Sequence, residues 1–412
     1  MTTIHDPITL AGAKLPNRLV KAAMSEALCG RDGLPNSELI QLYKTWADSS
    51  MGMLITGNVM VDPGALGEPG NCVIEADTPL EPIKAWSAAA KSAGSACVVQ
   101  ISHPGKQAPK GLNKQTVGPS AVPFSKEMQA FFATPKELSV DEIAVLVKRF
   151  ADTAARCEAG GFDGVQIHGA HGYLVSAFLS PKHNIREDNY GGSIENRMRF
   201  LTEIVTAIRA KTSEGFVLGV KLNSADFQRG GFSEEDSTTV IQQLESMGVD
   251  FVEVSGGTYE APAMTGVKSS TKAREAYFLE FAEKLRAQTK IKLMVTGGFR
   301  TQPAMDAALA SNALDLIGVA RPLAIEPDVA DRWFEGKDPK HKIKPIKTHL
   351  PPVDKAGLLE IFWYAAQFKD MGQGRAPNPK LSPYKVLFHY IKGNIKAMIK
   401  GGKKKPSRLR AK

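Results

Sequence analysis

The sequence contains no uninterrupted apolar run of about 18 residues, the length that a membrane-spanning helix needs. Its first residues, MTTIHDPITLAGAKLPNR, lack the basic and apolar segments of a secretory leader. Only four cysteines are present, at positions 29, 72, 97 and 157, and none forms a CxxC pair. We therefore expect a cytoplasmic protein with reduced thiols. Neither a cysteine-ligated metal site nor a disulfide framework is indicated.

Basic charge is in excess, but only at one end of the chain. The formal net charge is +9. Residues 385–412 hold ten basic side chains and no acidic one, whereas the other 384 residues hold 42 basic and 43 acidic side chains. The nearly neutral body therefore gives no sign of a nucleic-acid-binding surface. Because 43% of the residues are hydrophobic and 23% are charged, the composition is that of an ordinary globular protein.

Eight short apolar runs alternate with amphipathic stretches along the chain. Near-continuous Val, Ile and Leu are typical of parallel strands that are buried on both faces. The pattern predicts an α/β fold, a (β/α)8 TIM barrel, with a doubly wound open sheet as the alternative. The expected strands are 18–24, 52–60, 96–103, 162–169, 216–223, 249–257, 291–298 and 314–322.

Three regions follow from this pattern. We expect a barrel over 1–340, an extension over 341–384 that packs on it, and a basic amphipathic segment with a tail over 385–412. Within the barrel, residues 105–138 are long for a βα loop and predict a lid over the site, or else a surface excursion. For 385–412, docking on the barrel or on a second subunit is the preferred interpretation. Contact with an anionic membrane surface is the alternative, and nucleic acid is not favoured.

In a barrel of this kind, chemistry gathers at the carboxyl ends of the strands. Gly297 and Gly298 end the seventh predicted strand, and Ala320 and Arg321 end the eighth. Glycine backbone N–H groups and an arginine at these two places predict a phosphate site, although a tight turn with a surface arginine is the plain alternative. No GxGxxG opens a helix after a strand, so a mononucleotide fits better than a dinucleotide-binding domain.

His168, His171 and Tyr173 end the fourth predicted strand. We interpret the histidines as N–H donors to a substrate oxygen and the tyrosine as a proton donor. A zinc site or a pair of structural histidines is the alternative, but no HExxH pattern is present, so no metal is expected. Lys221 ends the fifth strand, where it would face an anionic ligand or form an ion pair with Glu253.

The chain resembles the Old Yellow Enzyme family of FMN-dependent ene-reductases, in the branch with two histidines. The resemblance rests on HGAHGYL, FLSP and REDNYGGSIENRMRF, the last at 186–200. It is supported by PNRLVKAAM, VVQISHPGKQ, MVTGG and IGVARPL in the family's order, over about residues 1–340. It implies one FMN at the mouth of the barrel and NADH or NADPH as the reductant.

The resemblance also implies the role of each site residue. His168 and His171 would bind the activating oxygen of a small-molecule substrate, and Tyr173 would protonate it. Ser25 would lie near the flavin O4, and Lys221 would stand near N1 and O2. The residues implied to contact FMN are Ala23, Met24, Ser25, Gly57, Gln100, His168, Lys221, Gly297, Gly298, Ala320 and Arg321.

Three positions depart from the family pattern. Lys221 and Lys106 stand where arginine is usual, and Ala23 stands where proline is usual. The expected activity is reduction of an activated C=C bond of an α,β-unsaturated carbonyl or related compound. An NAD(P)H oxidase, a demethylase, or a membrane-recruited flavin-binding protein is the alternative. The sequence leaves the physiological substrate and the assembly into a homo-oligomer open.

Overall fold

The computed structural model describes residues 1–261, 278–350 and 358–388. Eight parallel strands close into a barrel, because β4 (Met53–Ile55) pairs with both β3 (Leu19–Lys21) and β6 (Ala96–Ser102). The ring continues through β9 (Gly164–Gly169), β10 (Val217–Asn223), β11 (Phe251–Ser255), β12 (Lys292–Thr296) and β13 (Leu316–Val319). A two-residue strand, β5 (Val59–Met60), pairs with the end of β6. The predicted (β/α)8 barrel is confirmed, and each of the eight expected runs contains one of these strands.

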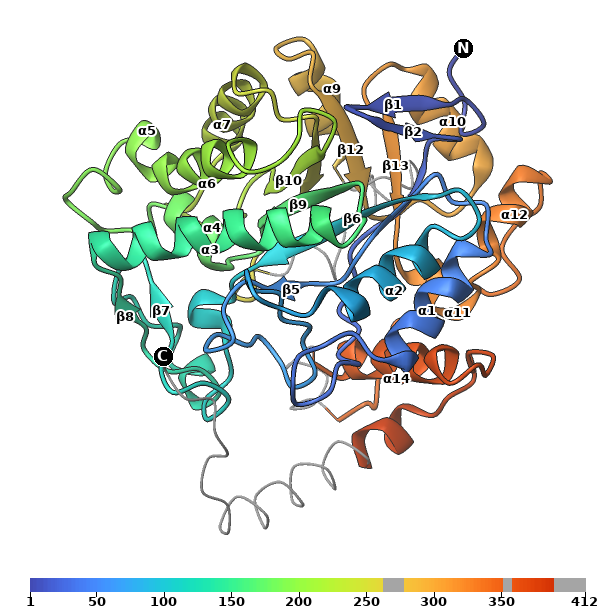
Figure 1. Ribbon diagram of the computed structural model, residues 1–412, viewed down its shortest axis with the longest axis horizontal. Helices are drawn as coiled ribbons and strands as arrows, with labels where there is room; N and C mark the ends of the chain where they lie inside the picture. The colour runs from blue at the N-terminus through green and yellow to red at the C-terminus, as the bar shows by residue number, and fades with distance from the viewer. Residues whose placement is uncertain (262–277, 351–357, 389–412) are drawn as a thin grey trace.

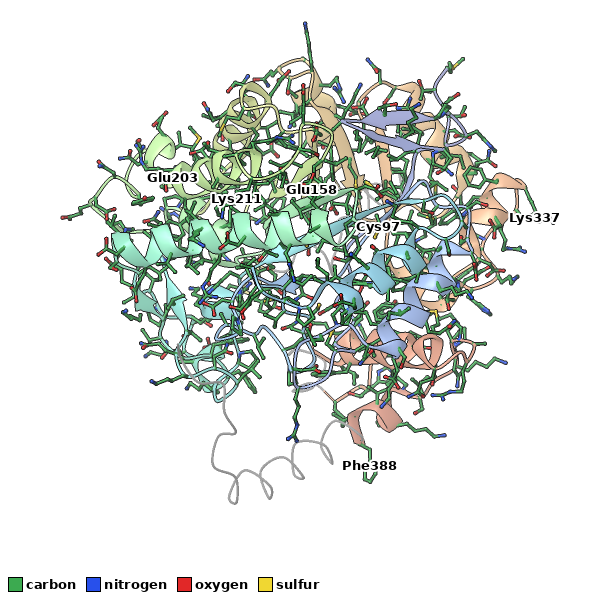
Figure 2. The ribbon with its side chains drawn as sticks, in the orientation of Figure 1. Cys97, Glu158, Glu203, Lys211, Lys337 and Phe388 are labelled. Carbon is green, nitrogen blue, oxygen red and sulfur yellow. The ribbon has the colours of Figure 1, made fainter. Side chains whose placement is uncertain are left out.

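Helices surround the barrel (Figure 1). They bury apolar faces against the strands, while charged side chains such as Lys211 and Lys337 lie on the outer surface (Figure 2). The main outer helices are α1 (Ser37–Ala47), α2 (Leu80–Ala90), α3 (Val140–Ala159), α6 (Arg199–Arg209), α7 (Glu234–Ser246), α9 (Leu279–Arg286), α10 (Gln302–Ala310) and α12 (Val329–Phe334).

Side-chain caps fix the starts of two of these helices. Ser139 with Glu142 and Ser233 with Asp236 form capping boxes at the starts of α3 and α7. Thr301 occupies the N-cap position of α10, but its side chain makes no capping hydrogen bond there.

The barrel interior is built in layers, because alternate residues of a strand face the same side. The hairpin of β1 (Ile8–Leu10) and β2 (Ala13–Leu15) contributes to the apolar cluster inside the barrel, which also contains Phe251. Gly219 makes room for that ring, since a Cβ at this position would lie 2.3 Å from it. The next inward position on β10 after Gly219 is Lys221, so the interior becomes polar toward the carboxyl ends of the strands.

The long segment after β6 folds against the same end of the barrel. It contains the short helices η1 (Gly105–Gln107) and η2 (Met128–Ala130), and a parallel pair of β7 (Val117–Gly118) with β8 (Lys136–Glu137). Arg186 donates to the carbonyl oxygens of Pro119 and Leu138, and it pairs with Asp188 at 2.6 Å. This segment is therefore braced by the loop that follows α4 (Leu174–Leu179).

The region after the barrel packs against its outer helices. Helix α14 (Leu358–Gly372) packs against α1 and α11 (Arg321–Ile325), as Figure 1 shows beside the blue helix α1. Within α14, Phe368 meets the ring of Trp46 edge-on, with 5.4 Å between the ring centroids. Residues 383–388 are helical, and the rest of the basic segment lies outside the described residues. Among the residues that the structure describes, no helix has the length and apolar character needed to cross a membrane.

Candidate active site

A cavity of about 360 Å³ opens at the carboxyl ends of the strands. Its size is typical of a site for a small molecule or cofactor. It brings together eleven of the thirteen residues that the sequence predicts for catalysis and cofactor binding. They are Ala23, Met24, Ser25, Gln100, His168, His171, Tyr173, Lys221, Gly297, Ala320 and Arg321.

Gly57 and Gly298 do not line this cavity. The N–H of Gly57 donates to Glu26 Oε1 over 2.9 Å and lies 3.1 Å from the hydroxyl of Tyr43. A Cβ at Gly57 would lie 2.4 Å from the carbonyl oxygen of Met24. Gly57 is therefore packed behind the cavity wall, where it contacts a buried cluster that also contains Lys21.

A hydrogen-bonded layer of polar side chains forms the floor of the cavity. The side-chain amide of Gln100 donates to Gln166 over 2.8 Å, and that of Gln166 donates to Glu253 over 2.7 Å. The other oxygen of Glu253 lies 2.9 Å from Lys221 Nζ. The ion pair with Glu253, given above as the alternative to an anionic ligand, is therefore present, and Lys221 also lines the cavity. An ammonium group has three donors, so one contact leaves others for a ligand.

His168 and His171 are held as neutral donors. Burial, followed by the positive charge of Lys221, places the pKa of both imidazoles well below the usual value. Nδ1 of His168 accepts a hydrogen bond from the backbone N–H of Ala170 over 3.4 Å. Its proton therefore belongs on Nε2, from which it can be donated to an oxygen atom in the cavity.

The backbone at His171 adopts a left-handed conformation, with φ of +63°. A non-glycine residue in this region is strained by roughly 1–3 kcal/mol, and such strain occurs most often at functional sites. Two hydrogen bonds hold it there: the backbone N–H donates to Asn223 Oδ1 over 3.1 Å, and Nε2 lies 2.7 Å from Ser255 Oγ. The turn directs this imidazole into the cavity beside His168, with 5.2 Å between the ring centroids.

Tyr173 precedes α4 and lies edge-on to His168, with ring centroids 4.7 Å apart. Burial raises the pKa of this phenol well above its usual value, so the hydroxyl is protonated at neutral pH. A protonated phenol beside two neutral imidazole donors can protonate a substrate atom whose neighbouring oxygen the imidazoles hold.

The side of the cavity formed by β12 and β13 has the features of a phosphate site. Gly297 and Gly298 have φ of +120° and +101°, a backbone conformation that residues with a side chain rarely adopt. Among the described residues, no hydrogen-bond partner faces the buried hydroxyl of Thr296, which lines the cavity. Arg321 begins α11 and pairs with Glu360 at 3.2 Å. These groups fit a mononucleotide whose phosphate lies here and whose ring lies toward Lys221.

Several wall residues were missed by the sequence analysis. Asn58 and Ser255 lie at strand ends and could have been found from that position alone. Glu68 and Tyr259 come from loops, and Glu360, Ile361, Tyr364 and Phe368 come from α14, for which the sequence gave no signal of a site. The additional wall residues are Asn58, Gly67, Glu68, Ser255, Tyr259, Phe278, Thr296, Glu360, Ile361, Tyr364 and Phe368.

The fold and the cavity together are those of a (β/α)8 barrel with a small-molecule site at the carboxyl ends of its strands. The model of the NADH:flavin oxidoreductase / NADH oxidase family matches residues 3–338. The chain therefore belongs to this family, the Old Yellow Enzyme family, as its motifs indicated. It is an NAD(P)H:flavin oxidoreductase, and its cofactor is FMN.

Individual relatives agree with this assignment. An NADH-dependent flavin oxidoreductase of Aspergillus parasiticus is 38% identical over 340 residues, which cover 79% of this chain and 76% of the relative. One of Neonectria is 38% identical over 357 residues, but the chain spans only 46% of that protein's length. The solved structure of the old yellow enzyme homologue from Zymomonas mobilis is 26% identical, with a TM-score of 0.71. That likeness covers 84% of this chain and 95% of the other.

Proposed function

We propose that this protein reduces the electron-poor C=C bond of α,β-unsaturated carbonyl or related compounds at the expense of NADH or NADPH. The observation that carries the proposal is the grouping of two neutral imidazole donors and one protonated phenol in the cofactor cavity. Such a set suits a substrate that needs its oxygen polarised and one carbon protonated, with no charged acid or base.

The cavity walls described above would hold FMN, which when bound would supply the hydride chemistry between the nicotinamide and the alkene. Side chains of the protein bind the substrate oxygen and supply the proton. His168 and His171 hold the substrate oxygen and stabilise the negative charge that develops on it. Tyr173 delivers its hydroxyl proton to the α-carbon. Lys221 and Gln100 would face the ring of the cofactor, while Gly297 and Arg321 would hold its phosphate.

Absorption spectroscopy of the purified holoenzyme tests the proposal. The flavin band should bleach with NADH or NADPH in the absence of oxygen, and it should return when 2-cyclohexenone is added. Tyr173→Phe should slow the return by about 10²- to 10⁴-fold, the usual size of a general-acid contribution, and should leave the bleaching intact. A band that returns only with oxygen would instead support an NADH oxidase, and equal loss of both steps would refute the role of Tyr173.

A further inference from the structure

A second tyrosine lies directly behind the proposed proton donor. The hydroxyl of Tyr259, in the loop after β11, is 2.9 Å from the hydroxyl of Tyr173. The adjacent Thr258 bridges to His171, and Phe132 of the segment after β6 packs beside the ring of Tyr259 with 6.2 Å between centroids. Tyr259 is therefore held in place from two sides, and both hydroxyl groups line the cavity.

Two phenols in contact have two hydroxyl protons, but only one of these protons can lie in the hydrogen bond between the two oxygens. When Tyr259 donates to Tyr173, the proton of Tyr173 is left to point at a ligand. Once that proton has been given away, the oxygen of Tyr173 carries a negative charge in a buried place, where an unpartnered charge is unfavourable. The hydrogen bond from Tyr259 then stabilises this charge, because hydrogen bonds to ionised acceptors are the stronger ones.

Glu68 lies on the same cavity wall, in the loop after β5. Burial, reinforced by the negative charge of Glu26, raises the pKa of its carboxyl group to about 7. The amides of Asn58 and Asn71 oppose this rise, and Asn71 Nδ2 lies 3.4 Å from Glu68 Oε1. Near neutral pH this carboxyl group is therefore partly protonated and can supply a proton.

Glu68 and the two tyrosines act on one another electrostatically. Burial raises the pKa of both hydroxyls. Tyr259 raises that of Tyr173 further, whereas the hydrogen bond with Tyr173 lowers that of Tyr259, and the charge of an ionised Glu68 then raises both. Formation of a tyrosinate is therefore easier when Glu68 is protonated. Lys221, a cation of the same cavity wall, acts on His168 and is paired with Glu253.

We propose that Tyr259 and Glu68 form a proton relay behind Tyr173, an inference that rests on the proposed alkene reduction. As the new C–H bond forms at the α-carbon, the O–H bond of Tyr173 breaks. Tyr259 passes its proton to Tyr173, Glu68 passes a proton to Tyr259, and Glu68 regains one from water. With the hydride that NADH or NADPH provides, the balance is one alkene, one nicotinamide and one proton consumed. Tyr259 and Glu68 are positioning and relay residues, and Tyr173 is the catalytic acid.

A double-mutant cycle on the holoenzyme tests the first link. Reoxidation of the reduced flavin by 2-cyclohexenone is followed in the wild type, Tyr259→Phe, Tyr173→Phe and the double variant. Loss of a hydrogen bond to a charged acceptor should slow Tyr259→Phe by about 10- to 100-fold. If Tyr259 acts only through Tyr173, the double variant should be no slower than Tyr173→Phe alone. If the rate losses of the two single variants multiply in the double variant, the relay is overturned. Tyr384→Phe, a change at an exposed tyrosine, is the matched control.

A pH series tests the second link with a measurement that does not depend on activity. Infrared spectra of the holoenzyme should show a protonated carboxyl band that disappears as the pH rises through about 7. The band should be missing in Glu68→Gln and kept in Glu335→Gln, a surface variant. In the wild type, the rate of alkene reduction should fall over the same pH range. In Glu68→Gln, this fall in rate should be absent. A wild type without such a band would overturn the role of Glu68.

The two proposals fail in different ways. If no activated alkene reoxidises the reduced flavin of the wild type, the proposed function is wrong, and the relay for this reaction is wrong with it. If reoxidation is normal but the losses multiply or the carboxyl band is absent, the relay alone is refuted.

Discussion

The ion pair between Arg321 and Glu360 should oppose the binding of FMN. Arg321 begins α11 at the proposed phosphate site, and Glu360 of α14 lies 3.2 Å from it. A phosphate at this place would share the guanidinium group with a carboxylate of the same sign. Glu360→Gln removes both the competition for Arg321 and the repulsion of the phosphate, so FMN should bind more tightly.

The size of the effect follows from the exposure of the pair. About a third of the Arg321 side chain and a quarter of the Glu360 side chain are exposed, at 33% and 26%. Ion pairs of this kind contribute roughly 0.2–1 kcal/mol. Since 1.4 kcal/mol is a tenfold change, the dissociation constant of FMN should fall by a factor of about 1.4 to 5.

Quenching of flavin fluorescence during reconstitution of the apoprotein measures this change. Riboflavin, which has the same ring but no phosphate, should bind equally well to the wild type and to Glu360→Gln. Glu335→Gln removes the same charge at an exposed ion pair with Lys337 and should affect neither ligand. Weaker FMN binding in Glu360→Gln, or an equal gain for riboflavin, would refute the placement of the phosphate beside Arg321.

Three further perturbations test the barrel and the floor of its cavity. Gly219→Ala should destabilise the fold by about 1–3 kcal/mol in urea unfolding, because the new methyl group would overlap the ring of Phe251. Lys221→Met should destabilise it by about 3–5 kcal/mol, because Glu253 is left as a buried charge without a partner. The double change with Glu253→Gln should recover stability but not FMN affinity. His183 is neutral when folded, since burial lowers its pKa to about 3. Between pH 6.5 and about 3, only the unfolded chain binds the proton of His183, so this histidine should lower folding stability by up to ~1.4 kcal/mol for each unit that the pH falls, and His183→Asn should remove that contribution.

Two of these changes have a matched control. Gly215→Ala places a methyl group where the nearest neighbouring atom is 3.7 Å away, so it should be nearly neutral. His341→Asn replaces an exposed histidine and is the control for His183→Asn. A stable Lys221→Met variant with normal FMN affinity would contradict the role given to that lysine. Equal pH dependence in His183→Asn and the wild type would contradict the assigned protonation state.

The strands could be predicted because their signal is local. A strand buried on both faces needs a continuous apolar run, and every such run in the sequence became a barrel strand. The same rule located most of the site, because parallel strands place their carboxyl ends at one rim. His168 and Lys221 are therefore neighbours in the register of β9 and β10, although 53 positions separate them in the sequence.

The rest of the site depends on contacts that no local pattern encodes. Glu68 and Tyr259 lie in loops, whose paths are set by what they pack against. Tyr259 is held by Phe132, and Glu360 reaches Arg321 only because α14 packs on α1. Gly57, which the family resemblance implied to contact FMN, lies behind the cavity wall, where its N–H donates to Glu26.

The register of the barrel also explains how one cation can serve two purposes. Lys221 pairs across the strands with both His168 and Glu253. It places positive charge at the floor of the cavity, where the ring proposed to lie there would carry negative charge when reduced. After burial, that same charge is the next cause of the lowered pKa of both histidines. A histidine pair that stayed protonated at neutral pH would add two charges beside Lys221. The lysine therefore favours the neutral donor form of the imidazoles that the proposed reaction requires.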